Sequence, residues 1–199
     1  MKFNNKHWMR VALLVALGAV SFSCSNEFTN SAAPVELLAT NVQDLQVIDL
    51  AGDPPGDESC SRDVGEILLQ AIVKNPLDGQ NQEFNTVRVT RYRVSYVRTD
   101  GGTLVPAPFV RSMDLLLQPG EGGQGLESFL VFQPDAIVQQ PFAALFTGDG
   151  RDPETGRRFV RMDVIMDFFG ETLAGANLSA RTRFTVDFCF DCGGCLPKE

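Results

Sequence analysis

The sequence predicts an all-β protein in which residues 42–199 form a single antiparallel β-sandwich of seven or eight strands. Short segments alternate apolar and polar side chains, which is the period of a strand with one buried face. Glycine, proline, asparagine and aspartate separate these segments at short intervals, as the turns of a sandwich require. Helix is expected to be a minor element, because only one short segment favours it.

The first two expected strands lie on either side of a proline-rich turn. Val42 to Leu50 is interpreted as the first strand, and the turn follows at residues 53–57. Residues 64–74 are apolar on both faces, which leaves a helix as the competing interpretation. The β-branched pair Ile72-Val73 and the stop at Asn75-Pro76 favour a buried strand.

The longest expected strand spans residues 84–99. Its apolar side chains occupy odd positions at Val87 and Val89 but even positions from Tyr92 onward. Because successive side chains of a regular strand point to opposite faces, this change of parity predicts a β-bulge near Thr90.

The middle of the chain is expected to contain shorter elements. Residues 104–110 include two prolines, which suits an edge or irregular extended segment. Strands are expected at residues 113–117 and 128–132, the latter with Ser128, Leu130 and Phe132 on one face. Pro141 is expected to open one short helix that ends at Phe146.

The clearest pair of strands follows. Even-numbered apolar residues share one face in residues 160–168 and again in residues 178–188, and residues 170–177 join them as a hairpin loop. Asp163 and Asp167 point to the opposite face. They are about 13 Å apart at the usual rise of a strand, whereas paired glycosidase carboxylates are about 5–9.5 Å apart.

Residues 1–23 have the layout of a secretory signal peptide. Lys2, Lys6 and Arg10 precede an apolar decamer at residues 11–20, and no acidic residue interrupts them. Ten helical residues reach about 15 Å, roughly half of a hydrocarbon core of about 30 Å. The segment is therefore expected to direct export rather than to remain as a membrane-spanning helix.

The end of this segment, Ser21-Phe22-Ser23-Cys24, resembles the lipobox of bacterial lipoproteins. The resemblance implies a lipid on Cys24, and the absence of aspartate at Ser25 implies an outer-membrane or surface anchor. Ser21 and Ser23 also fit the small-x-small rule of an ordinary signal peptidase, which remains the alternative. Residues 24–41 are polar and aperiodic and are expected to form a flexible tether.

Composition excludes several classes of activity. Without residues 1–23, the chain has 14 basic against 25 acidic residues, a formal net charge of −11 that disfavours nucleic-acid binding. The only histidine, His7, and the only tryptophan, Trp8, lie within the signal. Ser-His-Asp catalysis, Cys-His catalysis and histidine metal sites are therefore not expected. We predict a protein that is not an enzyme and needs no cofactor.

Four cysteines remain after Cys24, namely Cys60, Cys189, Cys192 and Cys195. An even number in an exported protein favours disulfides, and four cysteines allow three pairings. The same four thiolates also suit a tetrahedral zinc site, because Cys189, Cys192 and Cys195 follow one another with Cys-x2-Cys spacing. A redox-active pair is the third interpretation.

Two charged groups are weaker candidates for binding. Asp149, Asp152 and Glu154 offer a calcium site, although the spacing differs from an EF-hand and a solvated loop is the simpler interpretation. An anion-binding stripe is the second candidate, formed by Arg88, Arg91, Arg93 and Arg98 beside Arg181 and Arg183. Its alternative is cross-strand pairing of these arginines with the acidic residues of the domain.

Several short motifs resemble known β-sandwich proteins. Tyr92-x-Val94-x-Tyr96 resembles the third strand of fibronectin type III domains. The chain also resembles a group of uncharacterised bacterial lipoproteins with an immunoglobulin- or fibronectin-like sandwich, over about residues 60–190. The segments that carry this resemblance are Val73-Lys74-Asn75-Pro76, Thr90-Arg91-Tyr92-Arg93-Val94, Phe169-Gly170 and Leu173-Ala174-Gly175. It implies a fold and an exported location, and no activity.

These observations together predict an exported, lipid-anchored protein of the cell envelope, located at the outer membrane. We expect it to act as a non-catalytic binding or structural module. One alternative is a thiol- or metal-dependent activity at Cys189, Cys192 and Cys195. Another is a subunit of an envelope assembly that accepts a partner strand at the edge formed by residues 104–110.

Overall fold

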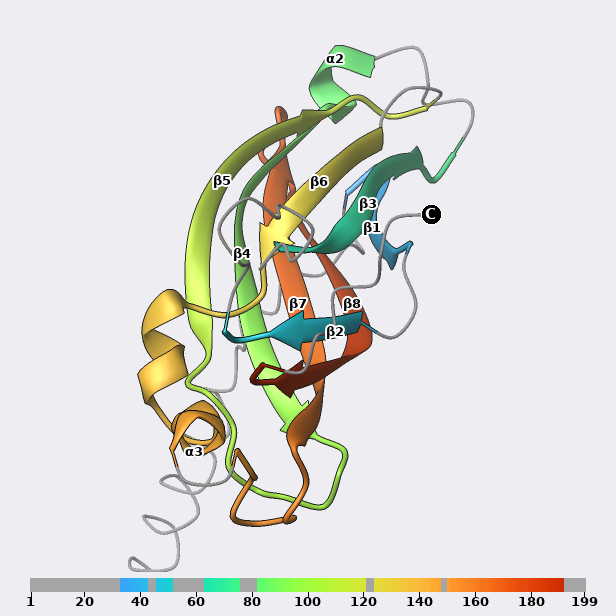
Figure 1. Cartoon of the computed structure of the whole chain (residues 1–199). Coiled ribbons are helices and arrows are strands. Elements are labelled where there is room, and N and C mark those ends of the chain that lie inside the picture. The colour runs from blue at the N-terminus through green and yellow to red at the C-terminus, as the bar shows by residue number, and fades with distance from the viewer. Residues whose placement is uncertain are drawn as a thin grey trace, which may run out of the picture.

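The computed structural model describes residues 33–42, 46–51, 63–75, 82–120, 124–147 and 150–191. The expected signal peptide, the proline-rich turn at residues 53–57 and the first part of the expected tether lie outside these ranges. Within them the protein is mostly β-structure, arranged as two facing sheets with a few short helices at the ends (Figure 1). The prediction of an all-β protein is confirmed.

The smaller sheet has three antiparallel strands in the order β1-β3-β6. Its strands are β1 (Val35–Asn41), β3 (Asp63–Val73) and β6 (Gln124–Leu130). The larger sheet has five strands in the order β2-β8-β7-β4-β5 and curls around the core. Its strands are β2 (Gln46–Asp49), β4 (Val87–Arg98), β5 (Phe109–Leu117), β7 (Phe159–Thr172) and β8 (Asn177–Cys189).

Three short helices complete the described structure. They are α2 (Gln82–Asn85), the 3-10 helix η3 (Pro134–Val138) and α3 (Phe142–Phe146). The first lies at one end of the two sheets and the other two lie near the opposite end (Figure 1). The short helix expected from Pro141 onward is confirmed as α3. In the described ranges, no helix has both the length and the apolar character needed to cross a membrane.

The larger sheet is mixed, which corrects the prediction of a purely antiparallel sandwich. β2 pairs with β8 in parallel, whereas the other described strand pairs are antiparallel. β1 belongs to the smaller sheet and β2 to the larger one, so the chain crosses between the layers within a few residues. The sequence does not reveal such a crossing, because a short strand has the same alternation of apolar and polar residues whichever sheet it joins.

The expected tether at residues 24–41 is wrong for its second half. β1 is an ordered strand, and its Val35 and Leu37 are fully buried in the core. The segment pairs residue by residue with β3, from Val35 opposite Val73 to Asn41 opposite Ile67. Residues 33–41 therefore belong to the folded domain.

The β-bulge expected near Thr90 is confirmed. The register of β4 shifts between Val89 and Arg91 against both of its neighbours, β5 and β7. The shift brings backbone close to Gly170, which pairs with Val89: a Cβ atom at Gly170 would lie 2.6 Å from the carbonyl oxygen of Arg88. Glycine is therefore required sterically at this position.

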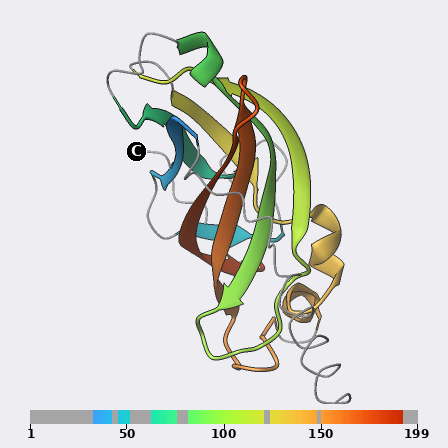
Figure 2. The same ribbon diagram turned by 180° about the vertical axis from the view of Figure 1, so that it is seen from behind.

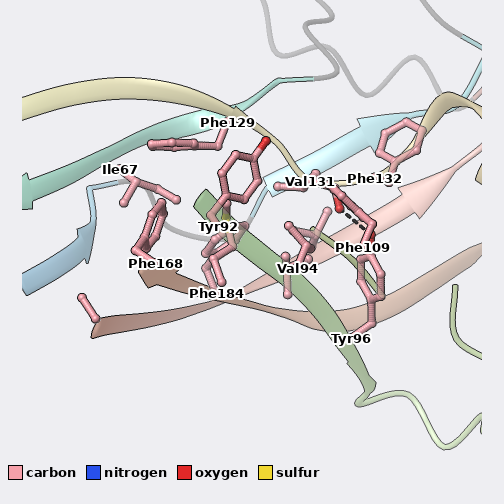
Figure 3. Packing of buried hydrophobic residues seen from close by; sticks show 14 of the residues in the cluster. Ile67, Tyr92, Val94, Tyr96, Phe109, Phe129, Val131, Phe132, Phe168 and Phe184 are labelled. Atoms are coloured by element: carbon pink, nitrogen blue, oxygen red, sulfur yellow. Dashed lines mark hydrogen bonds between the residues drawn. The ribbon is translucent and has the colours of Figure 1, made fainter. Parts of the chain in front are cut away.

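The core lies between the two sheets and is rich in aromatic residues (Figure 3). Tyr92 of β4 packs edge-on against Phe129 of β6, with ring centroids 5.2 Å apart, and also contacts Phe168 of β7. The hydroxyl of Tyr96 donates a hydrogen bond to the carbonyl oxygen of Val131 at 2.6 Å. Strand β4 is thus attached to the chain that leaves β6 on the opposite layer.

Other expectations fit with small corrections. β3 is a strand, which settles the choice between strand and helix for residues 64–74. β6 buries Phe129 rather than Leu130, and regular alternation ends before Phe132 because the strand stops at Leu130. The hairpin of β7 and β8 is confirmed along its whole length, with a loop shortened to residues 173–176.

Candidate binding surface

The cysteine predictions depend mainly on residues outside the described ranges. Cys24, Cys60, Cys192 and Cys195 all lie there. Cys189 is the last residue of β8, is buried, and places its sulfur 3.8 Å from the carbonyl oxygen of Ile48 on β2. Lipidation, disulfide bonding, zinc binding and redox activity at these cysteines therefore stay predictions.

The carboxylates proposed for calcium bind other parts of the protein. Asp152 accepts a hydrogen bond from Nη2 of Arg98 at 2.8 Å. Glu154 accepts three, from the backbone and side chain of Thr103 and from the backbone of Leu104. Asp149 lies outside the described residues, and inside them no group of three potential ligands is gathered for a metal ion.

Arg98 forms the most deeply buried ionic cluster of the described structure. Its side chain is 2% exposed, and the side chains of its partners Asp100 and Asp152 are fully buried. Burial alone would raise the pKa of each aspartate. The hydrogen bonds from Arg98, the other hydrogen bonds that each carboxylate accepts and the charge of Arg98 together outweigh burial, so both pKa values lie below the ordinary value of 3.8. The cluster joins the end of β4 to the loop before β7 and is structural.

Figure 2 views the five-stranded sheet from its outward face, the side away from the three-stranded sheet. Side chains that alternate with the core residues form rows of arginines and acids across β4, β7 and β8. The arginines of this face are Arg88, Arg91, Arg93, Arg161, Arg181 and Arg183. Arg98 is not among them, because it follows the buried parity of β4. The sequence had grouped it with the stripe, and that part of the prediction is wrong.

Most arginines of the face contact carboxylates on neighbouring strands. Arg161 pairs with Asp187 at 2.6 Å, and Arg183 pairs with Asp163, which also accepts a hydrogen bond from Thr185. Cross-strand pairing, the simpler interpretation of the sequence, is therefore confirmed for these residues. The pairs are held in register by the β7–β8 ladder, which sets Arg161 opposite Asp187.

Acids and arginines lie at different depths on this face. The side chains of Asp163 and Asp167 are only 8% and 7% exposed. Their partners Arg93, Arg181 and Arg183 are 47%, 65% and 59% exposed. The carboxylates therefore lie beneath the guanidinium groups, and the remaining N–H donors of the arginines point to solvent.

The centre of the face carries an excess of positive charge. Asp167 accepts hydrogen bonds from both Arg93, at 2.7 Å, and Arg181, at 2.5 Å. Arg91 lies over the ring of Phe169, with 5.1 Å between its Cζ and the ring centroid, and Arg93 lies 6.0 Å from the same centroid. We call these five residues the arginine patch. It contains three formal positive charges and one negative charge.

The electrostatics of Asp167 fix the charge state of the patch. Burial by itself raises the pKa of this carboxyl. The hydrogen bonds and charges of Arg181 and Arg93 together lower the pKa by a larger amount, so it lies below 3.8. Asp167 is therefore ionised at neutral pH and orients both arginines. The patch is suited to binding, through guanidinium donors flanking an aromatic ring.

Comparison of the chain with protein-family models, curated proteins and solved structures found no match. The site must therefore be judged from its own geometry. Sequence alternation had placed Arg91, Arg93 and Arg181 among the candidate residues. Phe169 was missed as a site residue. The sequence signal for Phe169 is its odd-numbered position on β7, which it shares with Asp167 and which places a large aromatic side chain on the outward face.

Proposed function

We propose that this protein is an exported, lipid-anchored module of the cell envelope that binds a ligand bearing carboxylate or phosphate groups. Its export and its attachment at the outer membrane through Cys24 rest on the sequence of residues 1–24. Its binding surface is the arginine patch. The observation that carries the proposal is the depth difference on the sheet, where buried carboxylates position exposed guanidinium groups.

The chemistry of the patch selects an anionic ligand. A guanidinium group presents five N–H donors in a planar fork that matches carboxylate and phosphate oxygens. Asp167 occupies only some of the donors of Arg93 and Arg181. Phe169 adds an apolar surface beside them, which favours ligands that place a ring or an aliphatic group next to the anionic group.

The negative charge of the rest of the chain restricts anion binding to the arginine patch. Without residues 1–23 the formal net charge is −11, so an anionic ligand is repelled at long range and attracted only where arginines are concentrated. Exposed charges are screened beyond about 8 Å at physiological ionic strength. Binding is therefore expected to depend on direct contact with the patch and to weaken as salt is added.

The strand order supports a finer assignment of the fold as an immunoglobulin-type sandwich. β1, β3 and β6 correspond to strands A, B and E of that fold, and β4, β5, β7 and β8 correspond to C, C′, F and G. On this assignment the arginine patch lies on the outward face of the G-F-C-C′ sheet. β2 is then a short additional strand beside G.

Two measurements test the proposal separately. Intact mass spectrometry of the protein isolated from its cells should show a diacyl or triacyl modification at Cys24, and an unmodified Cys24 would remove the anchor. Titration of the purified full chain with a fluorescent short polyphosphate, and in parallel with a fluorescent oligogalacturonate, should show saturable binding that weakens with salt. Absence of binding to both probes at low ionic strength would contradict the anionic-ligand assignment.

A further inference from the structure

β5 is an edge strand with an open side. It pairs with β4 along one edge, and in the described residues its other edge has no strand or loop hydrogen-bonded to it. Five of its nine residues are exposed, including four of the five from Val110 to Asp114. The edge predicted at residues 104–110 is therefore displaced, because residues 102–108 are irregular and the open strand is Phe109–Leu117. Open edges are templates for pairing with another strand.

The outward side chains of β5 follow the same order of polarity on either side of Met113. On the outward face, Val110 and Leu116 are each 59% exposed and enclose the polar pair Ser112 and Asp114. Large exposed apolar residues at both ends of an open edge are unusual, since edges are normally protected by charge or proline. The central position is Met113, which lies three residues from both Val110 and Leu116.

From this arrangement we propose that two copies of the chain associate through β5, antiparallel, with the two-fold axis at Met113. In this register Val110 lies opposite the partner's Leu116, and Ser112 lies opposite the partner's Asp114. Each pair occurs twice because the contact is symmetric. Apolar residues therefore face apolar residues, and a hydroxyl donor faces a carboxylate acceptor, which are favourable cross-strand pairs.

Other registers are less favourable. A register centred on Asp114 sets two carboxylates directly opposite each other, which is destabilising. A register centred on Ser112 sets Val110 opposite the partner's Asp114. Shifts by one residue would place the outward face of one copy beside the inward face of the other. Of these registers, only the one centred on Met113 sets apolar residues opposite each other at both ends and a hydroxyl donor opposite a carboxylate in the middle.

The pairing joins the larger sheets of two protomers into one ten-stranded sheet and creates a single continuous outward face. Each Asp114 keeps its ion pair with Arg88 of its own β4, at 2.8 Å, so its charge stays compensated beside the new edge. This inference is independent of the proposed ligand. It rests on the open edge and the sequence of β5, and the arginine patch takes no part in the contact.

Cysteine cross-linking tests the register in the full chain, expressed in its own cells and examined on non-reducing gels. Met113→Cys should give a covalent dimer by itself, because residue 113 faces its own copy. Ser112→Cys and Asp114→Cys should each give no more dimer than the wild type, whereas co-expression of these two variants should give a dimer. Absence of dimer with M113C, or equal dimer with M113C and S112C, would overturn the proposal.

A charge exchange tests the same contact without new cysteines. Ser112→Asp places two pairs of carboxylates opposite each other and should weaken dimerisation of the purified full chain about tenfold or more. The double variant S112D/D114S exchanges the two groups and should restore the wild-type association measured by sedimentation velocity. A wild-type chain that stays monomeric at all concentrations, or S112D and wild type that associate equally, would contradict the inference.

Discussion

Arg93 donates hydrogen bonds from Nη2 and Nε to one carboxylate oxygen of Asp167, at 2.7 and 3.2 Å. The two residues face each other on adjacent antiparallel strands, β4 and β7. The aspartate is buried while the arginine is about half exposed. The pair therefore acts as a support, in which a fixed negative charge below the surface orients a positive charge at the surface.

Asp167→Asn should lower the free energy of unfolding by about 1–3 kcal/mol, the usual cost of weakening buried hydrogen bonds to charged groups. Urea denaturation at pH 7 measures this loss. Glu171→Gln is a suitable control because Glu171 is exposed on the same strand and face. Equal denaturation midpoints for the two variants would show that the contacts of Asp167 do not stabilise the fold.

Arg98→Met should be the most destabilising single change among the charged residues described here. It removes the guanidinium group that hydrogen-bonds to both Asp100 and Asp152, whose side chains are fully buried, and breaking such a cluster costs about 3–5 kcal/mol. Arg88→Met removes an ion pair of similar length that is exposed to solvent, so its urea midpoint should stay near that of the wild type. Similar midpoints for both variants would contradict the structural role of Arg98.

The buried carboxylates of Asp100 and Asp152 predict a loss of stability at low pH. The pKa values of Asp100 and Asp152 are lowered in the folded state, so the unfolded chain binds protons at higher pH than the folded protein. Their contribution is therefore complete above the ordinary pKa near 3.8 and is lost as the pH falls through the lower folded-state values. Urea midpoints should be similar from pH 7 to pH 5 and should fall below about pH 4. An unchanged midpoint at pH 3 would disprove this.

The buried hydroxyl of Tyr96 predicts a loss of stability at high pH. Burial, followed by the neighbouring Tyr92, raises its pKa, so the folded protein holds this proton where the unfolded chain has released it. The stability from Tyr96 is complete below the ordinary pKa near 10 and is lost as the pH rises above it. Tyr96→Phe should cost about 1–3 kcal/mol at pH 7 by leaving the carbonyl of Val131 unpaired. The variant should also have a smaller loss of stability between pH 9 and pH 11, measured by urea denaturation.

The features that depend on local pattern could be predicted from the sequence. The change of parity between Val89 and Tyr92 located the bulge, because alternation along one strand is a strictly local signal. The even-numbered apolar residues of β7 and β8 gave their pairing and their outward faces. The same alternation separated the outward arginines Arg91 and Arg93 from the core tyrosines.

The features that depend on distant residues could not be predicted. The short parallel pairing of β2 with β8 joins residues about 140 positions apart and has no periodic signature. Asp152 looked like a loop carboxylate available to calcium, because its partner Arg98 lies 54 residues away in the sequence. The sequence of residues 25–41 predicts a tether because it is rich in Ser, Asn, Thr and Ala and has no sustained period, whereas the structure places β1 beside β3.

The central claim is that the arginine patch binds an anionic ligand, and the most direct test compares four proteins by titration with the fluorescent polyphosphate and oligogalacturonate probes. Arg93→Gln and Arg181→Gln remove donors of the patch, whereas Arg158→Gln removes the same charge from an exposed loop residue outside it. We expect both patch variants to bind at least about tenfold more weakly than the wild type, and R158Q to bind like the wild type. Equal weakening of all three variants would contradict the account, because binding would then follow net charge rather than the geometry of the patch.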